Sequence, residues 1–285
     1  MDWSCLLNTE LKNSQIRKLM KTYTTIESVY NNFDKLNDEI KRKIEKCREY
    51  ENSDKDLRII SYYDDEYPDF LRQIEDFPTF LFLKGKKLPA NWRIAIVGTR
   101  KYTNLGEKTC RHIIKGLSKY ENISTISGLA KGIDTIAHKA SLENNIHTIA
   151  VLPTSIYDCY PSENKELKDE IERRGTLISE FRKGEVLQKY NFVIRNRIIA
   201  AISNLVYIPQ SYKSGGSLIT AKLAGLYNRE IYASPGSIFD KSFEGCNNLI
   251  MKNEAKLVLN ASDIAYEYCW REKSEKIFGN SWITI

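Results

Sequence analysis

The sequence predicts an α/β fold, a Rossmann-like doubly wound and mainly parallel sheet with a small N-terminal helical domain. Two observations carry this prediction. From Arg93 onward, short apolar runs alternate with stretches whose apolar residues recur at a period near 3.6, the period of a helix. Three turns rich in glycine and basic residues each stand between an apolar run and a helical stretch. Such regular alternation is typical of a parallel sheet with helices on both faces.

The first part of the chain differs from the rest. Two groups of apolar residues follow helical spacing there, namely Ile16, Leu19, Met20 and Tyr23, then Leu36, Ile40 and Ile44. Residues 1–55 are therefore predicted to form a small helical domain, of the SAM-like or helix-hairpin-helix-like type. Residues 56–90 carry strand-like and short helical pieces punctuated by prolines. We expect them to form an extension that leads into the core.

The main domain is predicted over residues 91–262. Its expected strands are the apolar runs 94–97, 123–126, 148–152, 177–178, 205–208, 231–233 and 257–259. In open parallel sheets, ligands bind beyond the carboxyl ends of the strands, where the strand order reverses. The three glycine-rich turns all follow predicted strands. We therefore expect them to converge on one edge of the sheet.

These turns predict an anion site. A turn that feeds a helix N-terminus directs backbone N–H groups and a positive dipole end outward, which favours phosphate. The candidate phosphate-binding residues are Gly98, Thr99, Ser127, Gly128, Gly132, Ser214, Gly215, Ser217 and Thr220. An alternative stays open for the second turn. Its glycines would then serve close packing of helix on sheet, with Asp134 capping the helix.

A segment beginning at Lys189 adds cations beside aromatic rings. If it is helical, Ile194, Ile198, Ala201 and Ile202 form its core stripe. Arg195 and Arg197 then lie on opposite rims of that stripe, with both guanidiniums at the sheet edge. The alternative is a solvated pair on a surface helix. Lys189, Tyr190 and Phe192 precede them. Cations beside aromatic rings are typical of proteins that bind single-stranded nucleic acid.

Composition narrows the class of protein. The chain has 285 residues, 42% of them hydrophobic, and a formal net charge of +6, which favours polyanionic partners if the cations cluster. No apolar run is long enough for a membrane span, and the start lacks a signal-peptide pattern, so we expect a cytoplasmic protein. The six cysteines are scattered and are expected to be mostly buried free thiols, with no metal and no cofactor.

The sequence also contains residues that could act in acid–base catalysis. Asp134 and His138 are four residues apart on one helix face, and Glu180 ends a strand, so an acid–base set is conceivable. However, residues 217–227 contain no carboxylate, where similar phosphoribohydrolases place a catalytic glutamate. The sequence also lacks G-x-G-x-x-G and Walker A motifs. A binding protein is therefore expected rather than an enzyme, with a nucleotide sensor or a nucleoside-phosphate hydrolase as the alternative.

Several ordered motifs resemble the DNA-processing protein A family, also called DprA or Smf. They include Val97-Gly98-Thr99-Arg100, Ser127-Gly128-Leu129-Ala130, Tyr160-Pro161, Arg195-Asn196-Arg197-Ile198-Ile199-Ala200 and Pro235-Gly236, and the similarity spans about Leu57 to Asn260. The resemblance implies a single-stranded DNA-binding protein that forms homodimers and brings a RecA-type recombinase to the strand, as in natural transformation. Carried over position by position, the DNA-binding candidates are Arg100, Lys131, Lys189, Phe192, Arg195 and Arg197.

The chain departs from this family pattern in places. Pro209-Gln210 stands where an acidic residue usually follows the strand. Residues 263–285 are expected to form a C-terminal tail without the winged-helix domain that some members append. The tail carries Tyr266, Tyr268, Trp270, Phe278 and Trp282. We expect these aromatic side chains to cover the domain or a second subunit.

Overall fold

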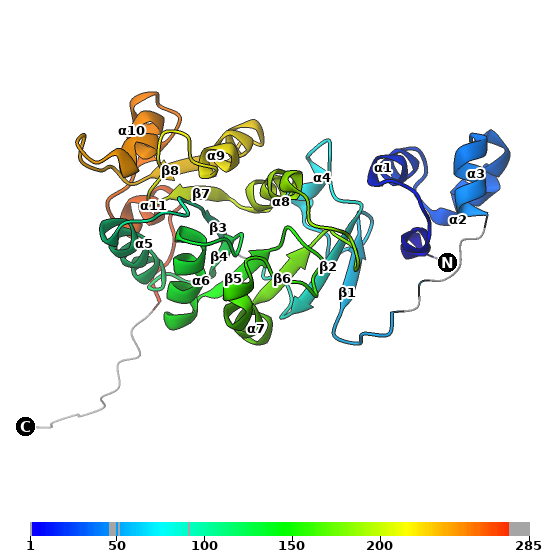
Figure 1. The fold of residues 1–285 in the computed structure, drawn as a ribbon, viewed down its shortest axis with the longest axis horizontal. Coiled ribbons are helices and arrows are strands. Elements are labelled where there is room, and N and C mark those ends of the chain that lie inside the picture. The colour runs from blue at the N-terminus through cyan, green and yellow to red at the C-terminus, as the bar shows by residue number, and fades with distance from the viewer. Residues whose placement is uncertain (1, 46–49, 51, 91, 274–285) are drawn as a thin grey trace, which may run out of the picture.

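The computed structural model describes residues 2–45, 50, 52–90 and 92–273. Within them, one sheet has the strand order β1-β2-β6-β5-β4-β3-β7-β8-β9 (Figure 1). All pairs from β6 to β9 are parallel, whereas β2 pairs antiparallel with β6 and β1 with β2. The doubly wound, mainly parallel sheet is therefore confirmed.

The strands lie close to their expected positions. Each of the apolar runs expected after Arg93 contains a strand, with ends shifted by no more than about two residues. The strands are β1 (Arg58–Ser61), β2 (Phe80–Gly85), β3 (Trp92–Ile96), β4 (Ile123–Ser127), β5 (His147–Val151), β6 (Thr176–Ser179), β7 (Leu205–Ile208), β8 (Glu230–Ala233) and β9 (Lys256–Leu257).

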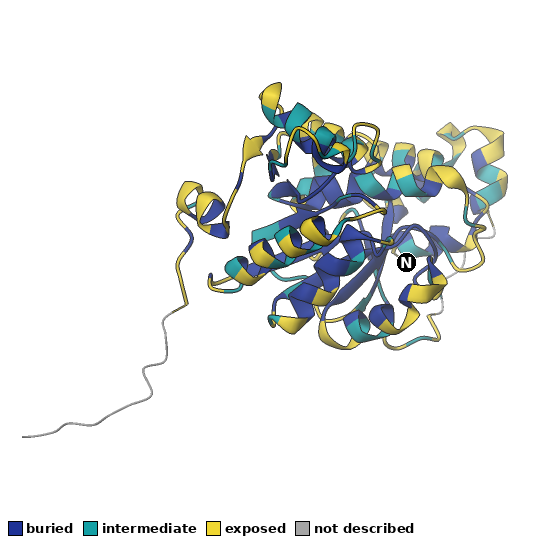
Figure 2. Cartoon of the chain, turned by 60° about the vertical axis from the view of Figure 1, so that its left-hand side comes forward, coloured by how far each residue is buried: buried dark blue, intermediate teal, exposed yellow. Residues whose placement is uncertain are grey.

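Helices cover both faces of the sheet. In Figure 1, α5 (Asn104–Leu117), α6 (Ile133–Glu143) and α7 (Lys165–Arg174) lie below the strands. On the other face lie α8 (Lys189–Ile202), α9 (Ser217–Leu226) and α10 (Glu244–Met251). The strands are buried between the two layers, and the exposed residues lie mainly on the outer helix faces and loops (Figure 2). This burial explains the continuous apolar runs in the sequence.

The order of the strands reverses at the centre of the sheet. From β3 the chain steps outward through β4 and β5 to β6. It then returns through α8 and places β7 on the other side of β3, from where it steps outward again to β9. Loops that leave β3 and β7 therefore diverge to opposite faces, which opens a crevice between them.

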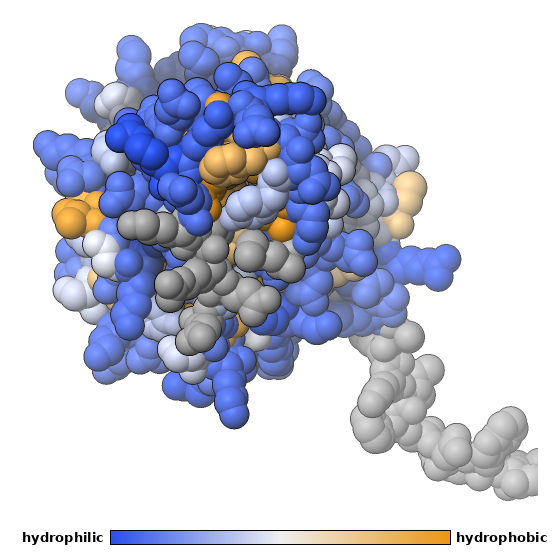
Figure 3. Space-filling model, turned by 90° about the vertical axis from the view of Figure 1, so that its right-hand side faces the viewer, coloured by the Kyte–Doolittle hydropathy of each residue, from blue (hydrophilic) through white to orange (hydrophobic). Residues whose placement is uncertain are grey.

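The N-terminal segment forms a separate group of helices. These are a 3-10 helix, η1 (Trp3–Asn8), then α1 (Asn13–Thr22), α2 (Ile26–Asn31), η2 (Phe33–Lys35) and α3 (Asp38–Ile44). They attach to the extension, which also holds α4 (Asp69–Arg72), through a Tyr63 hydroxyl that donates to Met20 O at 2.6 Å. The face that this end of the molecule turns to solvent is mostly hydrophilic (Figure 3). The proposed domain boundaries themselves stay a prediction.

The remaining elements are η3 (Ser162–Asn164), η4 (Lys241–Phe243) and α11 (Ala261–Glu267). Trp270 is buried against Trp92 and Tyr120 and stacks on Tyr268, whereas Tyr266 is exposed. Phe278 and Trp282 lie outside the described residues. Cys110 and Cys246 are buried free thiols, and Cys5 is also buried. Cys159 is half-buried, Cys269 is exposed, and Cys47 lies outside the described residues. No described helix combines the length and apolarity that crossing a membrane requires.

Candidate nucleic-acid interface

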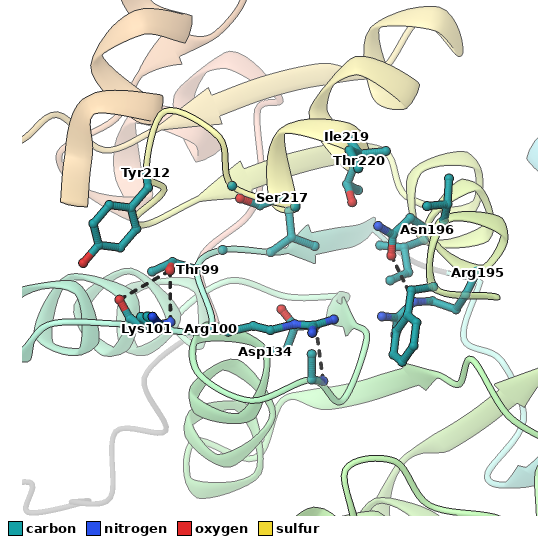
Figure 4. Close-up of a pocket in the computed structure, with 18 residues that line it drawn as sticks. Thr99, Arg100, Lys101, Asp134, Arg195, Asn196, Tyr212, Ser217, Ile219 and Thr220 are labelled. Atoms are coloured by element: carbon teal, nitrogen blue, oxygen red, sulfur yellow. Dashed lines mark hydrogen bonds between the residues drawn. The ribbon is translucent and has the colours of Figure 1, made fainter. Parts of the chain in front are cut away.

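A cavity of about 440 Å³ opens at the crevice between β3 and β7. Its lining residues come from three segments, 97–101, 192–199 and 212–220, and from Ala130 and Asp134 near the start of α6. Figure 4 shows Tyr212 and Lys101 at one end of this pocket and Asn196 and Arg195 at the other. The sequence predicted that all three turns converge, and all three contribute here, the first and third through several residues and the second through Ala130 and Asp134.

The loop after β3 is held from both sides. Thr99 N donates to Gln210 O at 3.0 Å, and Thr99 O accepts from Ile133 N at 3.1 Å. The Thr99 hydroxyl also accepts from Lys101 N at 3.0 Å. These bonds fix the backbone on either side of Arg100, whose side chain is exposed. The loop thus presents a solvent-accessible guanidinium at the pocket mouth (Figure 4).

An aromatic side chain faces this guanidinium. The Cζ atom of Arg100 lies 5.3 Å from the centroid of the Phe192 ring, within cation–π range. The Phe192 ring in turn meets Tyr160 edge-to-face, with centroids 5.3 Å apart. Phe192 comes from the first turn of α8 and Tyr160 from the loop after β5. The mouth of the pocket therefore combines a cation with two aromatic rings.

Arg195 lines the pocket, but its guanidinium is buried and does not lie free at the rim where the sequence predicted it. Arg195 is 3% exposed, and its Nη1 donates to Val151 O at 2.7 Å and to Gly128 O. Its Nε donates to Asn196 Oδ1 at 3.0 Å. Burial lowers the pKa of Arg195 to about 10, against the opposing pull of Asp134. Arg195 therefore contributes charge to the site from below.

Asp134 is the buried carboxylate of this site. Its Oδ2 accepts from Gly128 N at 3.1 Å and from Ala130 N at 3.4 Å. Burial raises the pKa of Asp134, and the neighbouring Arg195 charge and these two backbone bonds oppose that shift. The amides of the second glycine-rich turn are thus occupied by a carboxylate of the protein itself. These bonds favour the packing alternative for this turn, and its role as a phosphate nest stays a prediction.

The other atoms of that turn serve the same packing. The Ser127 hydroxyl donates to Ile96 O at 2.6 Å on the neighbouring strand. Gly132 has a φ of +81°, and a Cβ there would lie 2.4 Å from Thr99 O. Gly132 is therefore required where the loop after β3 crosses the start of α6.

Arg197 lies outside the pocket. This corrects the prediction that the guanidiniums of Arg195 and Arg197 both lie at the sheet edge. Arg197 is 6% exposed, with Nη2 2.5 Å from Glu180 Oε2 and Nε 3.1 Å from Asp76 Oδ2. The single-stripe prediction failed because α8 is covered on both sides, and Ile194 of the supposed stripe is half-buried. Contacts with α4 and α9 close around the face that was expected to meet solvent.

The turn before α9 is the second wall of the pocket. Gly215, Gly216, Ser217 and Thr220 line it at the N-terminal end of a ten-residue helix. Gly215 N donates to Tyr212 O at 3.0 Å, and the Ser217 hydroxyl lies 2.9 Å from that of Ser211. A helix N-terminus favours a negatively charged ligand. Because this helix N-terminus lines the pocket, we keep phosphate binding by this turn as a prediction.

The predicted residues therefore divide into two groups. Those that line the pocket are Gly98, Thr99, Arg100, Phe192, Arg195, Gly215, Ser217 and Thr220. Those that do not are Ser127, Gly128, Lys131, Gly132, Lys189, Arg197 and Ser214. Lys131 is exposed and lies 2.7 Å from Glu163 Oε1, and Lys189 is exposed at the start of α8.

Sequence reasoning missed several lining residues, including Lys101, Asn196, Tyr212 and Ile219. Lys101 and Asn196 stand inside motifs that the sequence had singled out, so membership of a turn or motif was the available signal. Tyr212 and Ile219 flank the glycines of the third turn in the same way. Counting the neighbours of the first and third glycine-rich turns would have included Lys101, Tyr212 and Ile219, and counting the residue between Arg195 and Arg197 would have included Asn196.

Gln210 has a structural reason to differ from the family pattern. Its side chain is fully buried, and Nε2 donates to the hydroxyls of Thr103 and Ser242, both at 2.7 Å. Its Oε1 accepts from Thr103 N at 3.0 Å. A carboxylate could not donate these two bonds. The amide therefore joins the start of α5 to η4 without burying a charge.

The conceivable acid–base set is not assembled. His138 is fully buried, with Nδ1 2.8 Å from Thr148 Oγ1, and burial lowers its pKa to about 3. Glu180 is paired with Arg197, and neither His138 nor Glu180 lines the pocket. Among the described residues no group of three or more His, Cys, Asp or Glu side chains is placed to hold a metal ion.

Comparison with known proteins identifies the family. Residues 58–269 match the family described as DNA recombination-mediator protein A. This chain belongs to that family. It is 41% identical to the DNA processing protein DprA of Streptococcus pneumoniae over 212 residues, which is 73% of this chain and 73% of the relative. The suspected resemblance to the DprA/Smf family is thereby confirmed.

Two solved structures of DprA proteins share the fold. The DprA structure from Streptococcus pneumoniae has a TM-score of 0.72 and 34% identity, and covers 93% of this chain and 89% of that chain. A DprA structure from Helicobacter pylori, whose description concerns single-stranded DNA binding, has a TM-score of 0.66 and 27% identity. It covers 75% of this chain and 95% of that one. This chain therefore shares its fold with two DprA proteins.

Proposed function

We propose that this chain binds single-stranded DNA in the pocket between β3 and β7. The observation that carries the proposal is the exposed guanidinium of Arg100 held 5.3 Å from the Phe192 ring at the mouth of a cavity at the switch point. The cation meets a phosphate, and the ring stacks a base. Membership of a DNA recombination-mediator family supports the same ligand, as does the DNA-binding relative from Helicobacter pylori.

The charge of the pocket fits a polyanion. Arg100, Lys101, Asp134 and Arg195 are its charged lining residues, and Asp134 and Arg195 offset each other. The remaining cations lie at the mouth, and the N-terminus of α9 adds a positive dipole end. Phosphate oxygens are the ligand class that this arrangement recognises.

The pocket favours a single strand over a duplex. In a duplex the base faces are stacked inside and cannot reach the Phe192 ring. A cavity of about 440 Å³ admits an unstacked nucleotide but not a base pair with both backbones. Its size also fits a free mononucleotide, the ligand of the sensor alternative. Displacement of a bound oligonucleotide by mononucleotides at comparable concentration would favour that alternative.

Replacing Arg100 by alanine is the direct test. The Arg100→Ala variant is expected to bind an oligothymidylate about tenfold more weakly, because a charge-assisted phosphate contact is lost. Its plot of log affinity against log salt is expected to flatten by about 0.7, the value for one phosphate of a single strand. Arg173→Ala is the matched control, since Arg173 is exposed on α7 and does not line the pocket. Equal affinity and equal salt slope for wild type and Arg100→Ala would overturn the proposal.

We also propose that the chain acts by binding and not by catalysis. The acid and base candidates are separated and internally paired, so no described pair is poised in the pocket to transfer a proton. Incubation with labelled DNA or nucleoside phosphates is expected to return them unchanged. Turnover that Asp134→Asn abolishes would contradict this.

A homodimer is the assembly that we propose. Strand β9 ends the sheet, and Leu257 on it and Leu259 just after it are exposed large apolar side chains, as is Met251 at the end of α10. An open edge strand with apolar neighbours is a template for association. Two copies would present two pockets to one strand and raise its apparent affinity.

The recombinase is the partner that we propose for the loaded strand. The family is described as a recombination mediator. Since both proposed partners, DNA and a recombinase, are found inside the cell, we also propose a cytoplasmic location. The expected result is faster assembly of a RecA-type filament on single-stranded DNA that is coated by a single-strand-binding protein. Arg100→Ala is expected to lose this acceleration together with DNA affinity.

A further inference from the structure

A short projecting turn follows β8. Ile238 and Phe239 are 86% and 91% exposed, and Phe239 is the most exposed large hydrophobic residue in the described part of the chain. Asp240 N donates to Ser237 O at 3.0 Å, so these two side chains occupy the centre of a four-residue turn. We call residues 237–240 the apolar tip.

The apolar tip is anchored at both ends. On one side, the Asn247 amide clamps Gly236, accepting from its N and donating to its O, each at 3.0 Å. On the other, Asp240 Oδ1 accepts from Ser242 N at 2.9 Å and from the Ser242 hydroxyl at 2.5 Å. The backbone is thus fixed on both sides of Phe239. A ring held in this way loses little conformational entropy when a ligand covers it.

The tip lies beside the Tyr212 end of the pocket. Strands β7 and β8 are parallel neighbours, so the loops that follow them share one edge of the sheet. Ser242 accepts from Gln210 Nε2, Gly245 N donates to Ser211 O at 2.8 Å, and Lys213 Nζ lies 3.2 Å from Glu244 Oε1. Figure 4 shows α10, which begins just after the tip, above Tyr212.

The chemistry around the tip favours nucleic acid over protein. Lys101 and Lys241 are exposed on the loop after β3 and on η4, and Lys213 on the loop after β7 is exposed but paired with Glu244. The nearby carboxylates are engaged within the protein, Asp240 with Ser242 and Glu244 with Lys213. The cores of protein–protein interfaces are depleted in lysine, whereas single-stranded nucleic acid uses aromatic rings flanked by cations.

We propose that the apolar tip is a second stacking contact, where Phe239 takes a base of the strand that leaves the pocket past Tyr212 and Lys101. The inference rests on the proposed function, since it assigns a longer path to the same DNA. Ile238, at the adjacent turn position, adds further exposed apolar surface. The bound strand would therefore run from Phe192, through the pocket, to the loop after β8.

The test uses the full chain and oligothymidylates of increasing length. Phe239→Ala is expected to leave the affinity for the shortest bound oligonucleotide unchanged and to weaken binding of longer ones by about tenfold, the loss of one base–aromatic stack. Phe239→Tyr is expected to bind the longer oligonucleotides about as tightly as wild type, because its ring can still stack. Phe239→Leu is expected to bind them almost as weakly as Phe239→Ala. A 2-aminopurine base placed along the longer strand should change its fluorescence on binding at one position in wild type and not in Phe239→Ala.

Tyr266→Ala is the matched control. Tyr266 is an 89% exposed aromatic residue on α11, which packs against α5 near Gly116, at the helix end away from the pocket. Equal affinity of Phe239→Ala and Tyr266→Ala at every length would overturn the second contact while leaving the pocket intact. Wild-type protein that binds no oligothymidylate, or an unaffected Arg100→Ala variant, would instead remove the proposed function and this inference with it.

Discussion

Three arginines near the pocket illustrate how environment decides what one residue type does. Arg100 reaches solvent beside an aromatic ring, Arg195 donates to main-chain carbonyls, and Arg197 is held by two carboxylates. A buried guanidinium whose donors are already used cannot reorganise around a phosphate without leaving its partners unpaired. We therefore expect substitution of Arg100 to affect binding, and substitution of Arg195 or Arg197 to affect folding first.

A buried histidine gives a prediction on pH. Burial, with a smaller effect from the Arg195 charge, lowers the pKa of His138 to about 3 from an ordinary value of 6.5. Between these two values His138 is protonated in the unfolded chain but neutral in the folded chain. The free energy of unfolding therefore falls as pH drops from 6.5 toward 3. This one group contributes about 1.4 kcal/mol per pH unit in that window.

The His138→Gln variant should lose that contribution. Urea unfolding at several pH values between neutral and about pH 5 measures this contribution. The unfolding free energy of His138→Gln should fall less steeply with decreasing pH than that of wild type. His112→Gln, a change at an exposed position of α5, serves as the control. Parallel pH profiles for wild type and His138→Gln would contradict the prediction.

At the residue scale, the sequence correctly predicted that Arg100 is an exposed cation at the site. It did not predict that Arg195 and Arg197 are buried. Arg100 was predictable because it stands in a turn that follows a strand. The partners of Arg197, Asp76 and Glu180, lie far away in sequence and carry no pattern that links them to it. The same holds for Val151 O, which binds Arg195. Such contacts depend on the tertiary structure alone.

Helix α8 is the element that joins the pocket to the rest of the protein. Its first turn supplies Phe192 to the pocket, and Arg197 one turn later ties it to Asp76 of the extension. From there the link continues, since Arg17 of α1 donates to Phe77 O at 2.9 Å and to Asp76 O at 3.1 Å. Periodicity predicted this helix correctly. It could not show that segments from the N-terminal part would cover its second face.

Breaking this link gives a prediction for the element. Arg197→Met leaves Glu180 buried without its partner, and removal of one member of a buried ion pair costs about 3–5 kcal/mol. Chemical denaturation should show this as a lowered unfolding midpoint, whereas Arg173→Met on exposed α7 should not. The double variant Arg197→Met with Glu180→Met should recover most of the loss. A single variant as stable as wild type would show that the pair is not held as described.

At the scale of the whole molecule, the repeated strand–helix pattern was enough to predict the sheet and the edge where ligands bind. It did not give the strand order. The placement of β7 beside β3, and of the antiparallel β2 beside β6, pairs segments more than ninety residues apart. Local periodicity contains no information on such pairing. For this reason the convergence of the turns on one edge was predictable, whereas the sequence left the choice between packing and anion binding open for the second turn.

The proposed dimer is a prediction at this scale as well. Leu257→Asp places a charge on the open edge, and it is expected to shift the chain from dimer to monomer in sedimentation at micromolar concentration. Val186→Asp, on the loop after β6, is the matched control at another exposed apolar position. A wild-type chain that sediments as a monomer under these conditions would remove the dimer.

The split origin of the pocket walls has a consequence during synthesis. One wall comes from residues 97–101 and the other from residues 212–220, so a nascent chain released from the ribosome only as far as β6 has half a site. Domains form from the N-terminus as the chain emerges. Affinity for nucleic acid would therefore arise only after α9 has left the exit tunnel. An unfinished chain would not bind the RNA of the ribosome that is synthesising it.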